Sequence, residues 1–212
     1  FGRPALDAAV AIDRAVVSGE AFSQIRFDSK GAPEASAFTL SATARGFALN
    51  GAGRLVPGTP LKLELAAFEA RRDSRRNALA NPASLSFPAA GVEIADLALA
   101  IDAGRVTLDG RAGETLDLRL TARAVPLSAA RILAPGLDLS GTLDAQAQIG
   151  GRQDAPTGPW QLRIARLVTP QTRQAGLPPI EFAGKGELDG ARTSVDATLS
   201  AGRVADEPLR GQ

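Results

Sequence analysis

The sequence predicts an all-β chain that is built mainly from antiparallel strands. Hydrophobic and polar residues alternate with a period of two through most of the 212 residues, as in strands with one apolar and one polar face. Turn-forming residues separate these runs at intervals of about 8 to 12 residues, which is typical of successive hairpins. Long helical patterns between the strands, which a parallel α/β sheet needs, are missing from the sequence. A sandwich, a barrel and an open meander all fit this pattern.

The alternating runs follow one another along the chain. Residues 61–65 give the first clear run, with Leu at every second position and charged residues between. Residues 116–124 repeat the pattern, residues 139–149 give the longest unbroken alternation, and residues 160–164 give another. Turn signals separate the runs; they are Pro57-Gly58, Asp102-Ala103-Gly104, Asp109-Gly110, Gly150-Gly151, Asp189-Gly190 and Ala201-Gly202.

Residues 92–101 require a choice between strand and helix. Their apolar residues fit one helical face, but they also fit a strand whose phase changes near Ala95-Asp96. We predict a strand with a bulge at that point, because Val106 and Leu108 after the next turn then read as its hairpin partner.

A second segment that resists the strand assignment is residues 128–133, where a short helix is expected. This segment follows Pro126 and precedes Pro135, and Ser128 is placed to cap its first turn. One or two helical turns fit between the two prolines. The sequence thus predicts a succession of strands with a small helical connection at this point.

The arginine-rich stretch at residues 71–76 predicts the longest polar connection in the chain. It suggests a sub-boundary near residues 70–84 within one elongated β-rich segment that spans residues 1–212. A solvated loop is the favoured interpretation of the arginines, and a site for anionic headgroups is the alternative. Because the chain contains no Met, even at position 1, we expect it to be a fragment of a larger protein or a processed chain.

The composition argues against most enzyme classes. The chain contains no Cys and no His, so the common nucleophile–base pairs and transition-metal sites cannot form. The acidic residues Glu64, Asp117, Asp144 and Glu181 fall on polar strand faces, where nothing would shift a carboxyl pKa toward catalysis. We therefore predict no catalytic residue, no metal site and no cofactor. Basic residues are spread along the chain and the net charge is +1, so no nucleic-acid partner is expected.

The apolar strand face is the remaining candidate for function, because a contiguous apolar surface must be covered by something. A second sheet could cover it, and so could acyl chains, which need apolar contact and no polar partner. The candidate lining residues are Leu97, Leu99, Ile101, Val106, Leu108, Leu116, Leu118, Leu120, Leu139, Leu143, Ile149, Trp160, Leu162 and Ile164. Trp160 heads its run and is expected in the core or at the rim.

A series of soft motifs built from Gly, Leu and Pro runs through residues 84–202. In order they are Leu97-Ala98-Leu99, residues 104–110 (GRVTLDG), Val125-Pro126-Leu127, residues 134–143 (APGLDLSGTL), Ile149-Gly150-Gly151, Pro156 and Trp160-Gln161-Leu162. This order resembles the TamB family, the inner-membrane-anchored subunits of the translocation and assembly module, to which AsmA-like proteins are distantly related. Residues 1–83 share only the general strand style.

The resemblance implies a long curved sheet folded lengthwise into a trough with an apolar interior, a β-taco. It implies a periplasmic location in a Gram-negative bacterium, within a parent protein that is anchored in the inner membrane. It also implies phospholipid acyl chains as ligands, and an outer-membrane barrel partner of the TamA/BamA type that contacts parts outside this segment. The expected role is phospholipid transfer between membranes or outer-membrane protein assembly, and the family offers no catalytic residues.

A structural or adhesive module is the alternative function. In a β-sandwich or β-solenoid of this kind the apolar faces would form the protein's own core, and no ligand would bind. The two interpretations differ in whether the apolar positions can be reached from outside.

Overall fold

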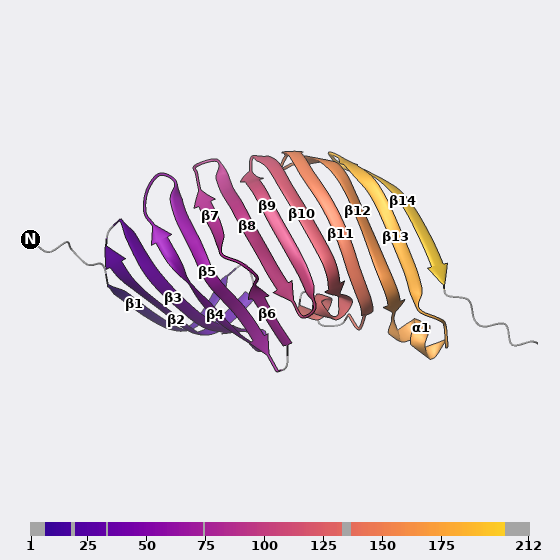
Figure 1. Cartoon of the computed structure of the whole chain (residues 1–212), viewed down its shortest axis with the longest axis horizontal. Coiled ribbons are helices and arrows are strands. Elements are labelled where there is room, and N and C mark those ends of the chain that lie inside the picture. The colour runs from indigo at the N-terminus through magenta and orange to yellow at the C-terminus, as the bar shows by residue number, and fades with distance from the viewer. Residues whose placement is uncertain (1–6, 18–19, 33, 74, 133–136, 202–212) are drawn as a thin grey trace, which may run out of the picture.

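The computed structural model describes residues 7–17, 20–32, 34–73, 75–132 and 137–201. Three sequence-based assignments lie partly outside the described residues: Leu133 of the expected helix, residues 134–136 of the TamB-like motifs, and Gly202 of the last turn signal. Within these ranges the chain forms one long, curved antiparallel sheet of 14 strands (Figure 1). The prediction of an all-β chain made of one antiparallel sheet is therefore confirmed.

The strands follow chain order, and most of them are joined by short turns. The first seven are β1 (Ala8–Val17), β2 (Glu20–Ala32), β3 (Ala35–Ala44), β4 (Phe47–Val56), β5 (Leu61–Arg72), β6 (Arg75–Leu79) and β7 (Ala83–Phe87). The others are β8 (Gly91–Ile101), β9 (Gly104–Gly113), β10 (Thr115–Pro126), β11 (Ser140–Arg152), β12 (Ala155–Val168), β13 (Ile180–Asp189) and β14 (Arg192–Ala201). Nearly every strand pairs with the strands before and after it, so the sheet is an open meander.

Strands β6 and β7 share one position in the sheet, between β5 and β8. The ladder is interrupted between them at Pro82, whose nitrogen has no hydrogen to donate. The gap is bridged by other donors. The Ala80 amide donates to the Ala98 carbonyl at 2.7 Å, and Asn81 Nδ2 donates to the Asp96 carbonyl at 2.9 Å. The two short strands therefore act as one broken strand.

The arginine-rich stretch is not the solvated loop that the sequence predicts. Strand β5 continues to Arg72 and β6 begins at Arg75, so the four arginines lie in paired strands on either side of a tight turn. Asp73 in this turn has a φ of 53°. Polar composition alone suggested a loop, whereas the ladder across the turn holds the segment in the sheet. In the region of the predicted sub-boundary, residues 70–84, both β6 and β7 pair with β5 and β8, so these strands belong to the same sheet.

A β-bulge interrupts β8 between Ile94 and Leu97, as the sequence predicts, and the helical alternative for this segment is wrong. The bulge residue Asp96 has a φ of 59°. Bulges of the same kind occur in β10 at Ala124 (φ 48°) and in β12 at Arg166 (φ 54°). Bulges increase the local twist, so their recurrence in alternate strands supports the curvature of the sheet.

Each of these three bulges is held by a carboxylate from the next strand along the chain. The positive φ turns the bulge amide out of the ladder, and a side-chain oxygen accepts its hydrogen. The pairs are Asp96 N to Asp109 Oδ1 (2.7 Å), Ala124 N to Asp144 Oδ1 (2.8 Å) and Arg166 N to Glu181 Oε1 (3.1 Å).

Removing one such acceptor should destabilise the sheet. We expect Asp144→Ala to lower the free energy of unfolding by about 1 kcal/mol, because the Ala124 amide loses its partner. Asp144→Asn keeps an acceptor oxygen and should restore most of this loss. Urea unfolding followed by circular dichroism measures both changes. If the Asn variant is as unstable as the Ala variant, the carboxylate acts through its charge and not as an acceptor for the bulge.

The expected short helix is present as a 3₁₀ helix, η1 (Leu127–Ile132), between β10 and β11. A second helix, α1 (Pro170–Gln174), follows β12 and was not predicted. Both lie at the same edge of the sheet, here called the helix edge (Figure 1). The Thr169-Pro170 pair was the available signal for α1, since Thr caps helices and Pro favours their first turn.

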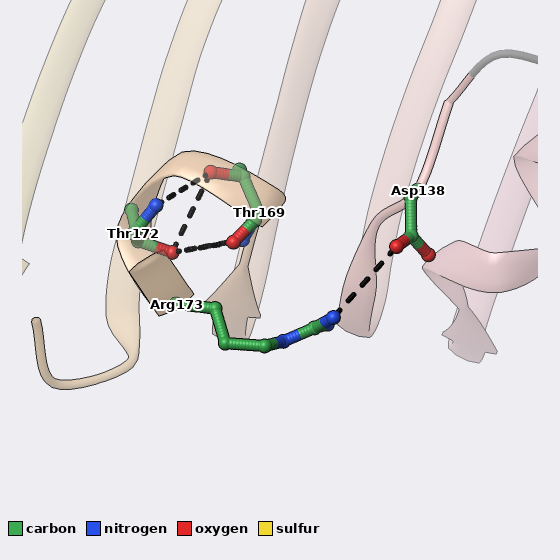
Figure 2. A network of polar contacts seen from close by, with 4 residues as sticks. All are labelled: Asp138, Thr169, Thr172 and Arg173. Atoms are coloured by element: carbon green, nitrogen blue, oxygen red, sulfur yellow. Dashed lines mark hydrogen bonds and ion pairs between the residues drawn. The ribbon is translucent and has the colours of Figure 1, made fainter. Parts of the chain in front are cut away.

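A reciprocal capping box starts α1 (Figure 2). The Thr172 amide donates to Thr169 Oγ1 at 3.2 Å, and the Thr169 amide donates to Thr172 Oγ1 at 2.9 Å. Arg173 Nη1 then lies 3.8 Å from Asp138 Oδ2, which precedes β11. This ion pair links the segment between β12 and β13 to the segment between β10 and β11.

Candidate functional site

The register of the sheet separates its side chains into two faces. Directly paired residues of an antiparallel ladder point to the same side, so each row of partners can be followed from strand to strand. The apolar face is the one whose rows pass through Leu120, Ala122 and Leu143. The polar face carries the intervening rows through Thr121 and Asp144.

The predicted lining residues come together in adjacent rows of the apolar face. One row joins Leu97, Leu108, Leu120, Ala147, Trp160 and Gly186; the next joins Leu99, Val106, Ala122, Ala145, Leu162 and Gly184; a third joins Val125, Leu143, Ile164 and Phe182. Leu116, Leu118, Ile149 and Ile101 lie on the same face by alternation along their strands. Every predicted lining residue except Leu139 therefore lies on this face within a strand.

Leu139 lies just before β11, which begins at Ser140. The sequence predicts regular alternation from Leu139 onward, but the regular strand starts only after Gly141. Gly141 has a φ of 127°, and the pairing of β11 with β12 shifts between Ser140 and Thr142. The irregular start of β11 is thus the physical reason for the difference.

The apolar face extends well beyond the predicted residues. In the first half of the chain one row joins Leu55, Leu63, Leu85 and Ile94, and beyond β12 the face continues through Phe182, Val195 and Leu199. Alternation was visible in these strands as well. Glycines and bulges interrupt it in β4 and β5, so the strands could not be joined into one face from sequence.

Trp160 covers two glycines of the neighbouring strand. A methyl group built at Gly186 would lie 2.9 Å from Trp160 Cζ2, and one at Gly184 would lie 3.6 Å from Trp160 Cζ3. The indole therefore extends across β13 in the space that two side chains would otherwise fill. The two glycines thus relieve crowding within their strand. Trp160 is half-buried at this position.

Side chains on the apolar face shield one another although the sheet is a single layer. Ala122 is 6% exposed, Phe38 is 7% exposed and Phe47 is 6% exposed. Among the described residues no second sheet or helical layer packs over this face (Figure 1). Neighbouring side chains of the curved sheet supply this shielding. At the β14 edge shielding is lost, and Leu199 is 69% exposed.

The polar face carries charges that neutralise one another across strands. Arg111 Nη2 lies 3.2 Å from Glu93 Oε1, and Arg163 Nη2 lies 3.4 Å from Glu181 Oε2. A depression of about 750 Å³ over β10–β14 is lined by side chains of this face, including Gln146, which accepts a hydrogen bond from Gln161 at 3.1 Å. Ala122, Ala145 and Leu162 of the apolar face are also among the residues that line it.

The part of the chain that the structure describes contains no group of three Asp or Glu residues placed to hold a metal ion. That the chain is not an enzyme stays a prediction. The arrangement offers an extended apolar surface rather than a reactive centre, so binding by burial of hydrocarbon is the chemistry that it supports.

None of the helices in the described ranges is long and apolar enough to cross a membrane. Comparisons with known protein families, with curated proteins and with solved structures found no match to this chain.

Proposed function

We propose that this chain is the periplasmic segment of a TamB-like protein and that its apolar face binds phospholipid acyl chains. The observation that carries the proposal is the continuous apolar face, which runs across the sheet with no second layer over it in the described residues. The parent protein would be anchored in the inner membrane and would engage an outer-membrane barrel through other segments. Its role would be lipid transfer or outer-membrane assembly.

Acyl chains suit this face chemically. Across β10–β13 its rows consist mainly of Leu, Ile, Val, Ala and Gly, with Trp160 and Phe182, so they present mostly hydrocarbon. Burial of apolar area contributes roughly 25 cal/mol per Å² and needs no fixed orientation, so a flexible chain can slide along such a surface. A site that must release its ligand benefits from this lack of direction.

The length of the face favours a conduit over a single binding pocket. The strands occupy 13 successive positions from β1 to β14, because β6 and β7 share one. At a spacing of about 4.8 Å this path measures about 58 Å, well beyond the hydrocarbon thickness of a bilayer at about 30 Å. Several acyl chains could therefore lie on the face in series.

Photo-crosslinking tests the proposal. We expect a benzophenone side chain at Leu118 or Leu162 to capture phospholipid in intact cells, and native mass spectrometry of the purified chain to show bound lipid. The same probe at Arg119 of β10 or Gln161 of β12, on the polar face of the same two strands, is the matched control and should capture none. If the apolar positions capture only protein and no lipid co-purifies, the face is covered by protein and the structural-module alternative replaces the proposal.

A further inference from the structure

We propose that Arg72 and Arg75 bind the phosphate of a phospholipid headgroup at the helix edge of the apolar face. The inference rests on the proposed function and gives that site a substrate class and an orientation. Lipids with an anionic phosphate would lie with the headgroup at this edge and the acyl chains along the rows of the face.

Strand alternation divides the four arginines of β5 and β6 between the two faces. Arg71 pairs with Arg76 in the ladder, and both lie on the polar face beside Glu69. Arg71 Nε lies 3.2 Å from Glu69 Oε1, and Arg76 donates a hydrogen bond to Glu69 Oε2. This bond from Arg76 lowers the pKa of Glu69, so the carboxylate stays ionised and offsets their charge.

Arg72 and Arg75 form the next pair of the ladder and lie on the apolar face. The Arg72 guanidinium is 5.7 Å from the centroid of the Phe47 ring, a buried residue of that face. Arg75 is half-buried, and its Nη1 donates to the Ser128 carbonyl of η1 at 3.4 Å. Both guanidinium groups are thus fixed over the apolar face rather than directed away from it.

The charge of this second pair is poorly neutralised. The carboxylate nearest to Arg72 is that of Asp73: its Oδ2 lies 4.0 Å from Arg72 Nε, and the Asp73 side chain is 91% exposed. Within the described residues no carboxylate lies within ion-pair distance of Arg75. Two guanidinium groups beside an apolar surface match a phosphate diester, because guanidinium donors pair geometrically with phosphate oxygens.

The polarity of the apolar face changes in the order that a phospholipid requires. Asn77 follows Arg75 on the same face and pairs with Ala70 and Ile101. Leu79 comes next and pairs with Leu99, one of the predicted lining residues. Moving away from the helix edge, the face therefore offers guanidinium groups, then an amide, then aliphatic side chains. Phosphate, ester carbonyls and acyl chains follow the same sequence in the lipid.

Binding of two lipids with identical acyl chains tests the inference. The probes are phosphatidylglycerol and diacylglycerol, each with one fluorescent acyl chain. Each probe is titrated with the whole chain of 212 residues. We expect the wild-type chain to bind phosphatidylglycerol about tenfold or more tightly than diacylglycerol, because only the former carries a phosphate. Arg72→Gln/Arg75→Gln should remove this preference and leave diacylglycerol binding unchanged.

The matched control is Arg71→Gln/Arg76→Gln, which removes the same charge from the opposite face and should keep the preference. Trp160 emission and circular dichroism verify that each variant is folded. If the Arg72/Arg75 variant keeps the preference, the inference is overturned while the proposed function stands. If the wild-type chain binds neither lipid, the proposed function fails as well. If millimolar inorganic phosphate displaces phosphatidylglycerol from the wild-type chain, the pair is a site for free phosphate and the headgroup assignment is overturned.

Discussion

Leu143→Asp is expected to abolish acyl-chain binding while the sheet still forms. Leu143 lies in the apolar row between Val125 and Ile164 and is half-buried. In the lipid-free chain a carboxylate at this position can still reach water, because no second layer covers the face in the described residues. Bound hydrocarbon would remove that water, and the unpaired charge should weaken binding at least about 100-fold, or about 3 kcal/mol.

Titration with a fluorescent fatty acyl probe measures this loss, and urea unfolding measures the stability of the variant. Gln148→Asp is the control, because Gln148 lies on the polar face of the same strand, opposite Arg119. It should change neither binding nor stability. If Leu143→Asp instead lowers the free energy of unfolding by several kcal/mol, Leu143 belongs to a covered protein core and the face is not a binding surface.

Gly186→Ala is expected to give the largest loss of stability, at about 3 kcal/mol. A methyl group at this position would overlap the backbone carbonyl oxygen of Ser194 in β14 and would lie 2.9 Å from the Trp160 ring. The backbone cannot yield without breaking the β13–β14 ladder, in which Gly186 pairs with Val195. The indole would also have to leave its position over the strand.

Trp160 is the single tryptophan of the chain, so its emission reports this displacement directly. We expect a red-shifted spectrum together with the lower unfolding midpoint. Gly150→Ala is the matched control: a methyl group there would come no closer than 3.8 Å to any atom, so stability and emission should stay near the wild-type values. Equal effects of the two substitutions would show that chain flexibility, and not the contact with Trp160 and Ser194, explains the loss.

Local pattern predicted much of the fold because each strand carries its own signal. The bulge at Ala95-Asp96 could be located from a phase change alone, since a slip of one residue moves the following side chains to the other face. The arginine-rich stretch was misread for a related reason. Strand β5 ends at Arg72 and β6 begins at Arg75, and the charges on both sides conceal the alternation that places these two arginines on the apolar face.

The candidate site could be predicted only in part, because its rows depend on pairing between strands. Alternation placed Leu143 and Leu162 on apolar faces, but their positions in adjacent rows follow from the register of β11 with β12. Leu139 shows the limit of the same signal, since the irregular pairing at Ser140 leaves it outside the strand. Helix α1 depends on one capping residue, Thr169, within a short connection, and such brief signals are easily overlooked.

The sequential order of the strands makes the contacts of this sheet local along the chain. Apart from the shared position of β6 and β7, each strand exchanges ladder bonds only with its immediate neighbours in the chain, so stability accumulates link by link. Within the described residues β1 and β14 each have a single neighbour, so we expect fraying of this segment to start at these two strands and proceed inward. Such a sheet can gain or lose whole hairpins during evolution, because each added hairpin extends the apolar face and the polar face without changing the chemistry of either.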